Sequence, residues 1–445
     1  MLVLLSDVHL TDGTSGTTIN PRAFEKFGKI ILDIIGENKP PPNPVKKIEL
    51  VLLGDIFDVI RSEVWLYPEN KDLASPIRPW SGPEEVDQAG CNLEDYATRI
   101  VDGIICHPNN VTAKKFLEQF REKCGEKGVT LTVSYLIGNH DWLINRYAST
   151  RLAIARFLGL PDWDYYAEHP FPYYQEFPEY GVMARHGDYY DPLNYSGNRD
   201  ASSLGDALVI DLLNHFPREV KNALEKELAQ VQQDKVDAIY LQLKEIDNVR
   251  PLLEIPAWIK GACRGYPGDI EAKVHEVWNR LAEQFFHIPF VQDFVQANPL
   301  FGKLLRLALR ATTGISFGWL MRILAGKTIR GWYQSSDNYK SYAIKEPALK
   351  EDRVKYVVYG HTHAAAQVPL DIVTLKGQPQ PGWEKLYFNS GTWRKVYEHT
   401  AYDWRKCEFI GWHVLTFLIF YLSDEKEPDR NYEEWSASLG YGRQK

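Results

Sequence analysis

The hydrophobic positions of this chain fall into short runs of apolar, largely β-prone residues, separated by longer stretches with helical periodicity. Five of the runs, at residues 2–5, 50–53, 133–137, 182–184 and 354–359, end next to a cluster of polar residues. Runs of this length predict buried strands, and their alternation with helical stretches is typical of an α/β fold. Open α/β sheets gather their functional side chains where strands end. The polar clusters are therefore the first candidates for a functional site.

Two interruptions break the βα pattern. Residues 59–92 are rich in Pro, Trp and charge, which predicts a long irregular loop within the core, followed by helices at 93–106 and 111–123. Residues 202–325 have a mostly helical period, with helices expected at 203–215, 218–246, 270–286 and 303–324. Because the polar clusters resume after this block, we expect a helical insertion within a discontinuous core of residues 1–201 and 326–445.

Composition narrows the class of protein. A chain of 445 residues exceeds one compact core, so either two domains or one core with large insertions is expected. The net charge of −8 argues against a surface that binds nucleic acid throughout. Five cysteines, an odd number without a close metal-ligand pair, indicate free thiols in a reducing compartment.

The chain shows no secretory signal at its start. Its longest apolar stretch, residues 409–422, is interrupted by His413 and is shorter than the roughly 20 residues of a spanning helix. We therefore expect a cytoplasmic protein without a transmembrane segment, in which residues 409–422 form late core strands.

The polar clusters contain the ligand types that hold Mn, Fe or Zn: carboxylate oxygen, imidazole nitrogen and amide oxygen. Two such ions about 3.5 to 4 Å apart need one ligand that bridges them, and Asp55 is the natural bridge. The clusters are Asp7-Val8-His9, Gly54-Asp55-Ile56-Phe57-Asp58, Gly138-Asn139-His140-Asp141, His186-Gly187-Asp188 and Gly360-His361-Thr362-His363.

In this order the five clusters resemble the calcineurin-like metallophosphoesterase family. Its pattern Asp-x-His, Gly-Asp-x-x-Asp, Gly-Asn-His-Asp/Glu, His and Gly-His-x-His is matched throughout. The resemblance implies a four-layer α/β/β/α sandwich of two mixed sheets, here with a large helical insertion. It also implies a binuclear hydrolase that cleaves a phosphate ester or diphosphate bond by direct attack of a metal-bridging hydroxide.

The resemblance further implies a role for each residue. One ion would be held by Asp7, His9, Asp55 and His363, and the other by Asp55, Asn139, His186 and His361. His140 would be the catalytic group that stabilises the transition state or protonates the leaving oxygen, with Asp141 orienting its ring. Asp58 and Asp188 would support the centre from outside the coordination sphere.

The substrate stays open at this point. Residues 294–336 contain no Asp or Glu but six basic residues among apolar ones, which predicts a cationic helical patch. Three interpretations of this patch are open. It could belong to a helix pair that covers the core, or to a cap that binds a phosphorylated small-molecule or lipid-linked substrate. It could also make a peripheral contact with an anionic membrane. Candidate substrate-binding residues are Arg61, Arg306 and Arg310.

Related families give further alternatives. UDP-diacylglucosamine pyrophosphatases share a helical insertion and a turn like Asn389-Ser390-Gly391-Thr392-Trp393, but they are shorter and usually carry Arg in place of His140. A nuclease of the double-strand-break repair type would keep His140 and need a basic groove, which the net charge disfavours. A calcineurin-type protein phosphatase would carry Glu in place of Asp141. A non-catalytic metal-binding scaffold is the alternative outside enzymes.

Overall fold

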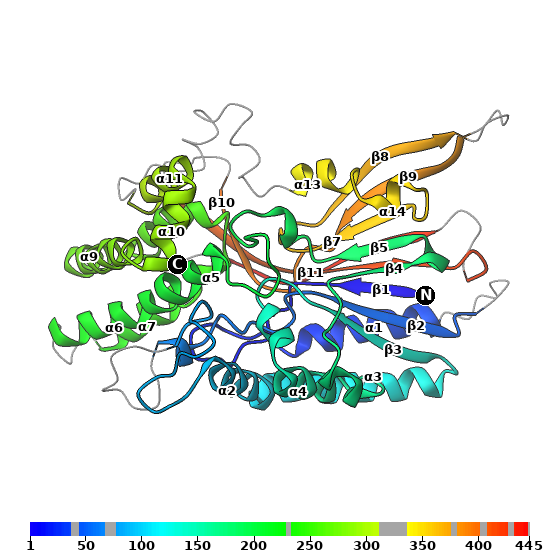
Figure 1. Ribbon diagram of the computed structural model, residues 1–445, viewed down its shortest axis with the longest axis horizontal. Coiled ribbons are helices and arrows are strands. Elements are labelled where there is room, and N and C mark those ends of the chain that lie inside the picture. Colours follow the sequence, from blue (N-terminus) through cyan, green and yellow to red (C-terminus); the bar gives the residue numbers. More distant parts are fainter. Residues whose placement is uncertain are drawn as a thin grey trace.

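The computed structural model of the chain describes residues 1–36, 44–66, 77–227, 233–310, 336–374, 381–400, 407–425 and 431–443. Over these residues the chain forms two mixed β-sheets and many helices (Figure 1). The predicted α/β class is therefore confirmed.

The first sheet has the N-terminal strand near its centre. Its strands in order are β3 (Thr130–Leu136), β2 (Lys47–Leu53), β1 (Leu2–Leu5), β11 (Phe409–Phe420), β10 (Val396–His399) and β6 (Val249–Arg250), with β12 (Tyr432–Arg443) paired to β11. β1, β2 and β3 are parallel, whereas β11 is antiparallel to β1. The carboxyl ends of β1, β2 and β3 therefore meet at one edge of the sheet.

The second sheet has five strands in the order β4 (Tyr174–Phe177), β5 (Val182–Arg185), β7 (Tyr356–Tyr359), β9 (Pro381–Asn389) and β8 (Ala366–Thr374). The three central strands β5, β7 and β9 are parallel, and the outer two are antiparallel to their neighbours. Parallel strands are usually buried on both faces, which explains the continuous apolar runs in β5 and β7.

Alternate residues of β1 contribute to two different cores, because successive side chains of a strand point to opposite faces. Leu4 belongs to a cluster that also contains Val358 of β7 and Phe388 of β9, so this cluster joins the two sheets. Val3 belongs to a larger cluster that also contains Phe27 from the helix α1 (Arg22–Gly36). β1 is thus buried between helices and the second sheet.

The remaining helices form three groups. α2 (Leu93–Cys106), α3 (Pro108–Glu126) and α4 (Ala148–Leu158) lie along the first sheet (Figure 1). α13 (Ser336–Ala343) and α14 (Pro347–Lys350) pack on the second sheet through a third apolar cluster. The helical block, gathered at one end of the sheets, comprises α5 (Leu204–Leu208), α6 (His215–Glu227), α7 (Gln233–Leu243), α8 (Ile255–Ala262), α9 (Gly268–Phe285), α10 (Pro289–Ala297) and α11 (Pro299–Arg310).

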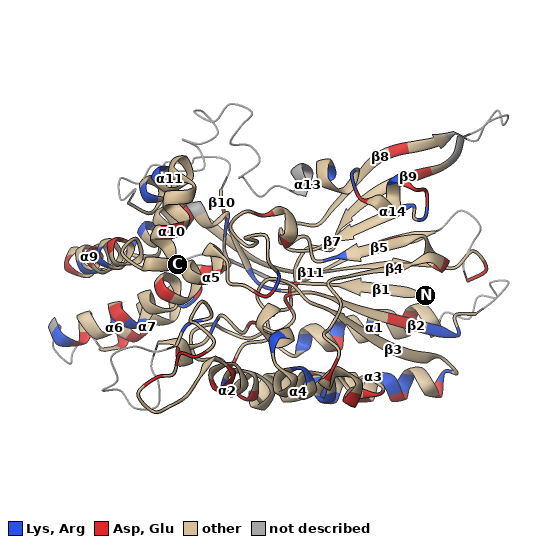
Figure 2. Cartoon of the chain, viewed as in Figure 1, with Lys and Arg blue, Asp and Glu red and all other residues tan. Residues whose placement is uncertain are grey.

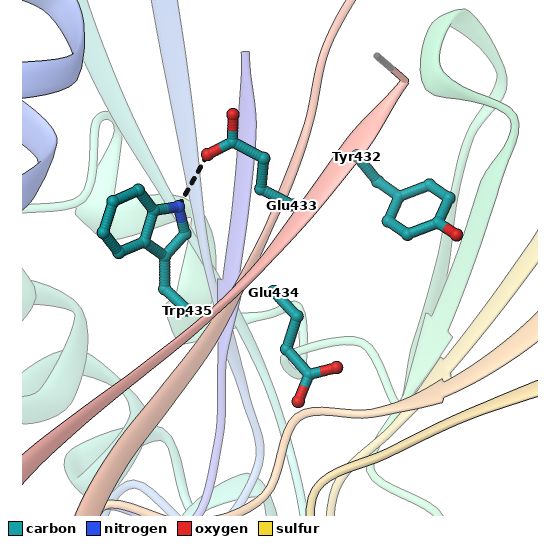
Figure 3. Close-up of a pocket in the computed structure, with 4 residues that line it drawn as sticks. All are labelled: Tyr432, Glu433, Glu434 and Trp435. Atoms are coloured by element: carbon teal, nitrogen blue, oxygen red, sulfur yellow. Dashed lines mark hydrogen bonds between the residues drawn. The ribbon is translucent and has the colours of Figure 1, made fainter. Parts of the chain in front are cut away.

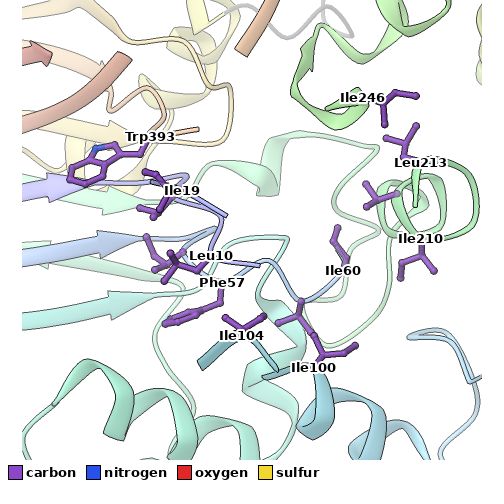
Figure 4. Close-up of a cluster of buried hydrophobic side chains, with 14 of the residues drawn as sticks. Leu10, Ile19, Phe57, Ile60, Ile100, Ile104, Ile210, Leu213, Ile246 and Trp393 are labelled. Carbon is purple, nitrogen blue, oxygen red and sulfur yellow. The ribbon is translucent and has the colours of Figure 1, made fainter. Parts of the chain in front are cut away.

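The helical block shares one apolar core with the first sheet. Ile210, Leu213 and Ile246 from the block belong to the same buried cluster as Phe57 and Ile60, which follow β2 (Figure 4). Lys, Arg, Asp and Glu lie mainly on the helices and loops, and the strands contain fewer of them (Figure 2). The block is therefore packed against the core through buried apolar surface.

Most predicted elements are present. The five strands and the helix at residues 93–106 are confirmed, and residues 59–66 and 77–92 are irregular apart from a short turn of helix at Glu63–Trp65. The single helix expected at 218–246 is wrong, because α6 ends at Glu227 and α7 begins at Gln233. The part of the expected 303–324 helix beyond residue 310 lies outside the described residues.

Over the part of the chain that the structure describes, no helix is both long enough and apolar enough to cross a membrane. The predicted absence of a transmembrane segment agrees with this finding. Residues 409–420 form the strand β11, as the sequence predicts.

The side chain of Arg61 links the helical block to the loop after β2. This position contradicts the prediction that Arg61 binds the substrate. Its side chain is fully buried. Nη1 donates to Oδ1 of Asn214 at 2.9 Å, Nη2 donates to the carbonyl of Ser15 at 2.8 Å, and Nε lies 3.7 Å from the carboxylate of Asp247. A guanidinium occupied in this way has no face left for a substrate.

Replacing Arg61 with Met should therefore lower stability rather than weaken substrate binding. Loss of the charged hydrogen bonds leaves buried acceptors without donors, at a cost of about 2 to 4 kcal/mol in the free energy of unfolding. Thermal and urea denaturation would measure it. Arg353→Met is a matched control, because Arg353 forms ion pairs at the surface with Glu176 and Glu351. An unchanged melting temperature for Arg61→Met would contradict this role.

Candidate metal centre

The five polar clusters all follow carboxyl ends of strands, three in the first sheet and two in the second. Backbone hydrogen bonds hold the loops together: the amide of Asp7 donates to the carbonyl of Gly54 at 3.1 Å, and that of Gly360 donates to the carbonyl of His186 at 2.8 Å. The amide of His361 donates to Oδ2 of Asp7 at 3.0 Å, which links the two sheets. The strand ends thus bring distant parts of the chain into one site.

Asp7, His9 and His363 form the first group of potential ligands. Nε2 of His363 lies 3.2 Å from Oδ1 of Asp7 and 3.3 Å from Nε2 of His9. One donor atom from each residue falls within 4.8 Å of the others, and all three side chains are almost completely buried. This is the group that the sequence predicts for one ion, apart from the bridging carboxylate.

Asp55, His186 and His361 form the second group by the same criterion. Oδ1 of Asn139 lies 3.0 Å from Nδ1 of His361, so the amide oxygen adjoins the group. These are the four residues predicted for the other ion.

The Asp55 carboxylate lies between the two groups. Its Oδ2 is 3.1 Å from Nε2 of His186 and 4.0 Å from Nε2 of His9, while its Oδ1 accepts a hydrogen bond from the amide of His140 at 2.8 Å. Burial alone would raise the pKa of Asp55, but the nearby imidazoles of His186 and His140 outweigh burial and hold it well below its usual value. Asp55 is therefore placed as the predicted bridge requires.

The hydrogen bonds of the histidines fit metal ligation. Nδ1 of His186 lies 2.9 Å from the carbonyl of Leu53, which can only accept, so this nitrogen carries the proton. Nε2 faces Oδ2 of Asp55 at 3.1 Å, and although burial lowers the pKa of His186, the carboxylates of Asp55 and Asp7 outweigh burial and raise it well above its usual value, so this pair of atoms attracts a positive charge. Nε2 of His186 and Oδ1 of Asp7 are buried without a hydrogen-bond partner. A cation between such groups satisfies both, as in metal sites whose histidines donate their other N–H to a carbonyl.

The backbone at the site is strained. Asp7, His9, Asp55, His361 and His363 have positive φ angles between 52° and 70°. For residues with a Cβ this conformation is uncommon, and it clusters at functional sites. All five of these residues are predicted metal ligands.

Glycine is required beside these residues. Gly54 has a φ of 78°, and a Cβ at this position would lie 2.6 Å from the His186 ring. Gly360 is equally confined, because a Cβ there would lie 2.7 Å from Oδ2 of Asp7. Any side chain at either position would displace a predicted ligand.

Asp58, and not Asp141, orients the His140 ring. Oδ1 of Asp58 lies 2.8 Å from Nδ1 of His140, and its Oδ2 lies 2.9 Å from Nδ1 of His9. The supporting role predicted for Asp58 agrees with these contacts. Burial lowers the pKa of His140, but the carboxylates of Asp58 and Asp55 outweigh burial and raise it to about 9.

The role predicted for Asp141 is wrong in this respect. Its carboxylate accepts hydrogen bonds from the amides of Gly138 and Ile56, at 2.6 and 3.0 Å, and from the hydroxyl of Tyr135 at 2.7 Å. Both oxygens of the Asp141 carboxylate are occupied by these hydrogen bonds, which link the loops after β2 and β3. Asp141 therefore supports the backbone that carries Asn139 and His140.

Two supporting contacts come from residues outside the five polar clusters. Oδ2 of Asp191 lies 3.0 Å from Nε2 of His361, so Nδ1 of that ring is the nitrogen left for an ion. The hydroxyl of Thr392 donates to the carbonyl of Asp7 at 2.9 Å, which gives the turn after β9 a part in the site. Asp188, predicted to be a supporting residue, is buried and pairs with Arg199.

The other predicted substrate residues have different surroundings. Arg306 on α11 lies 3.7 Å from the carboxylate of Glu283 and stacks over the ring of Phe286. The side chain of Arg310 and residues 311–335, which hold much of the predicted cationic patch, lie outside the described residues.

A surface hollow on β12 is a separate feature. It is lined by Tyr432, Glu433, Glu434 and Trp435, and Nε1 of Trp435 donates to Glu433 at 2.7 Å (Figure 3). Two carboxylates without a neighbouring cation in the lining do not suit a phosphate. None of the predicted ligands lines it.

Comparison with known proteins gives no relationship: no protein-family model matches the chain, and no curated protein matches it either.

Replacing Asp55 with Asn should abolish binding of both ions, because the loss of one negative charge removes the ligand that the two groups share. Mass spectrometry of Mn-loaded protein would count the ions per chain. Asp87→Asn is a matched control, since Asp87 is also buried and accepts hydrogen bonds from two amides and from Tyr96. Two ions retained by Asp55→Asn would contradict the bridging role.

Proposed function

We propose that the chain is a two-metal phosphoesterase of the calcineurin-like type, which hydrolyses a phosphate ester or diphosphate bond. The observation that carries this proposal is the position of Asp55 between two His/Asp groups, with His140 held beside them by Asp58. Asn139 completes the donor set of the second group.

The proposal includes the order in which the sheets and helices are layered. The apolar clusters pair helices with the first sheet, the first sheet with the second, and the second sheet with α13 and α14. This order supports a four-layer α/β/β/α sandwich that carries a helical insertion. None of the five cysteines is in a disulfide, which supports a cytoplasmic location.

In the proposed reaction each group of residues has a distinct task. Two bound ions, Mn, Fe or Zn, would supply Lewis acidity that activates water and neutralises charge on the phosphoryl oxygens. Asp7, His9, His363 and Asp55 would hold one ion, and Asp55, Asn139, His186 and His361 the other. Both groups are buried at strand ends, so their geometry is preorganised.

His140 would stabilise the transition state and protonate the leaving oxygen. Its ring lies against that of His9, with centroids 4.7 Å apart, and it retains 8% exposure. Because Asp58 fixes Nδ1, the ring has one orientation, and Nε2 is the nitrogen left to reach a substrate.

The class of substrate is tested with Mn-loaded protein and three matched substrates: a phosphomonoester, a phosphodiester and a diphosphate-linked nucleotide sugar. We expect hydrolysis of at least one. Preference for the diester favours nucleic acid or cyclic nucleotides, and preference for the diphosphate favours a nucleotide-linked or lipid-linked substrate. Hydrolysis of none, with metals bound, favours the non-catalytic scaffold.

His140→Ala should lower kcat by about 100-fold to 10,000-fold while both ions stay bound, because the ring acts on the leaving group rather than on the metals. Steady-state kinetics and metal analysis of the same sample would separate the two effects. His169→Ala is the control, since His169 is an exposed residue stacked on Tyr165. Unchanged turnover in His140→Ala would exclude a catalytic role for this ring.

A further inference from the structure

The helical block reaches the core sheet through the short strand β6. Val249 pairs with Tyr397 and Arg250 pairs with Glu398 in a parallel register with β10. Val249 is completely buried. The block therefore delivers the backbone of Arg250 to a fixed place at the edge of the first sheet.

The Arg250 guanidinium points at the first group of ligands. Nη1 donates to the carbonyls of Asp247 and Val249, at 2.6 and 3.0 Å. Nη2 lies 3.4 Å from Nε2 of His363, the same nitrogen that lies 3.2 Å from Oδ1 of Asp7. One side of the fork is thus held by the backbone, while the other side faces the metal centre.

Arg250 lacks the carboxylate partners that two nearby arginines, Arg394 and Arg61, have. Arg394 lies 2.8 Å from the Asp247 carboxylate and 3.5 Å from that of Asp58, and Arg61 also lies beside Asp247. Among the described residues, none of the carboxylates forms an ion pair with Arg250. The carboxylates of Asp247, Asp7 and Asp55 therefore act on the Arg250 guanidinium only from beyond ion-pair distance, and its close contacts are the two carbonyls and the ring of His363.

A guanidinium without an ion-pair partner favours an anion between itself and a cation site, because the two positive charges repel each other where the side chains are partly buried. A phosphoryl group is such an anion. Its non-bridging oxygens match the planar fork of arginine, which can donate two hydrogen bonds to them.

We propose that Arg250 is a catalytic residue of the helical block, which binds a non-bridging oxygen of the substrate's phosphoryl group. This inference rests on the proposed function and deepens it, since it makes the helical block part of the active site. The negative charge on the phosphoryl oxygens would lie between Arg250 and the two ions, so the interaction would contribute to transition-state stabilisation as well as to binding.

The test uses the Mn-loaded full chain and inorganic phosphate as the probe, measured by isothermal titration calorimetry. Arg250→Gln should bind phosphate at least about 10-fold more weakly and lower kcat/KM by about 100-fold, with two ions per chain retained. Arg250→Lys keeps the charge without the fork and should lie between Gln and the parent. Arg280→Gln, in the same block but paired with Glu219, should bind phosphate like the parent.

Phosphate binding by Arg250→Gln equal to that of the parent would overturn the inference. If Arg250→Gln does not fold, as judged by circular dichroism, Arg250→Lys decides in its place, and phosphate affinity equal to that of the parent overturns the inference. A parent that binds no Mn would overturn both this inference and the proposed function. A parent whose phosphate binding depends on Arg250, but which hydrolyses none of the three substrates, would support the anion site and remove only the proposed hydrolysis.

Discussion

The structure depends on keeping several buried carboxylates ionised within one small volume. Asp7, Asp55, Asp58 and Asp247 are each no more than 2% exposed. Placing an isolated carboxylate in such an environment costs several kcal/mol, so each must have a cationic or hydrogen-bonding partner. Imidazoles surround the first three and guanidinium groups surround the fourth. The charge of the site therefore determines which residues can surround it.

The same constraint explains the unusual backbone. The Asp-x-His and His-x-His segments must each turn sharply at a strand end while both of their polar side chains stay directed at one centre. Positive φ angles at Asp7, His9, His361 and His363 accomplish this at a cost of roughly 1 to 3 kcal/mol each. Hydrogen bonds between loops of different sheets, such as that from the amide of His361 to Asp7, help to offset this cost.

The sequence predicts which polar residues gather at the strand ends because each cluster is local: a short apolar run, often a glycine, and one or more polar residues. It does not distinguish Asp58 from Asp141 as the partner of His140, since both are carboxylates in the matched segments and only the path of the loop decides. Arg61 is misassigned for a similar reason, because sequence shows a cation near the site but not the direction of its side chain. The role of Asp191 depends on a contact with His361 from 170 residues away, for which the sequence contains no pattern. β6 is two residues long, too short for any periodicity.

The charged groups at the contact between the helical block and the core indicate whether the block only covers the core or also contributes to the site. If it only covered the core, its buried polar contacts would need to neutralise one another. Asp247 does so for Arg61 and Arg394, and Asp58 approaches Arg394 from the core side. Arg250 forms no ion pair among the described residues, and its Nη2 lies 3.4 Å from the predicted metal ligand His363. A partly buried guanidinium without an ion-pair partner costs stability, and proteins retain such costs mainly where function requires them. We therefore infer that the insertion and the strand ends together form one site, with the cation of the block facing the ligands of the sheets.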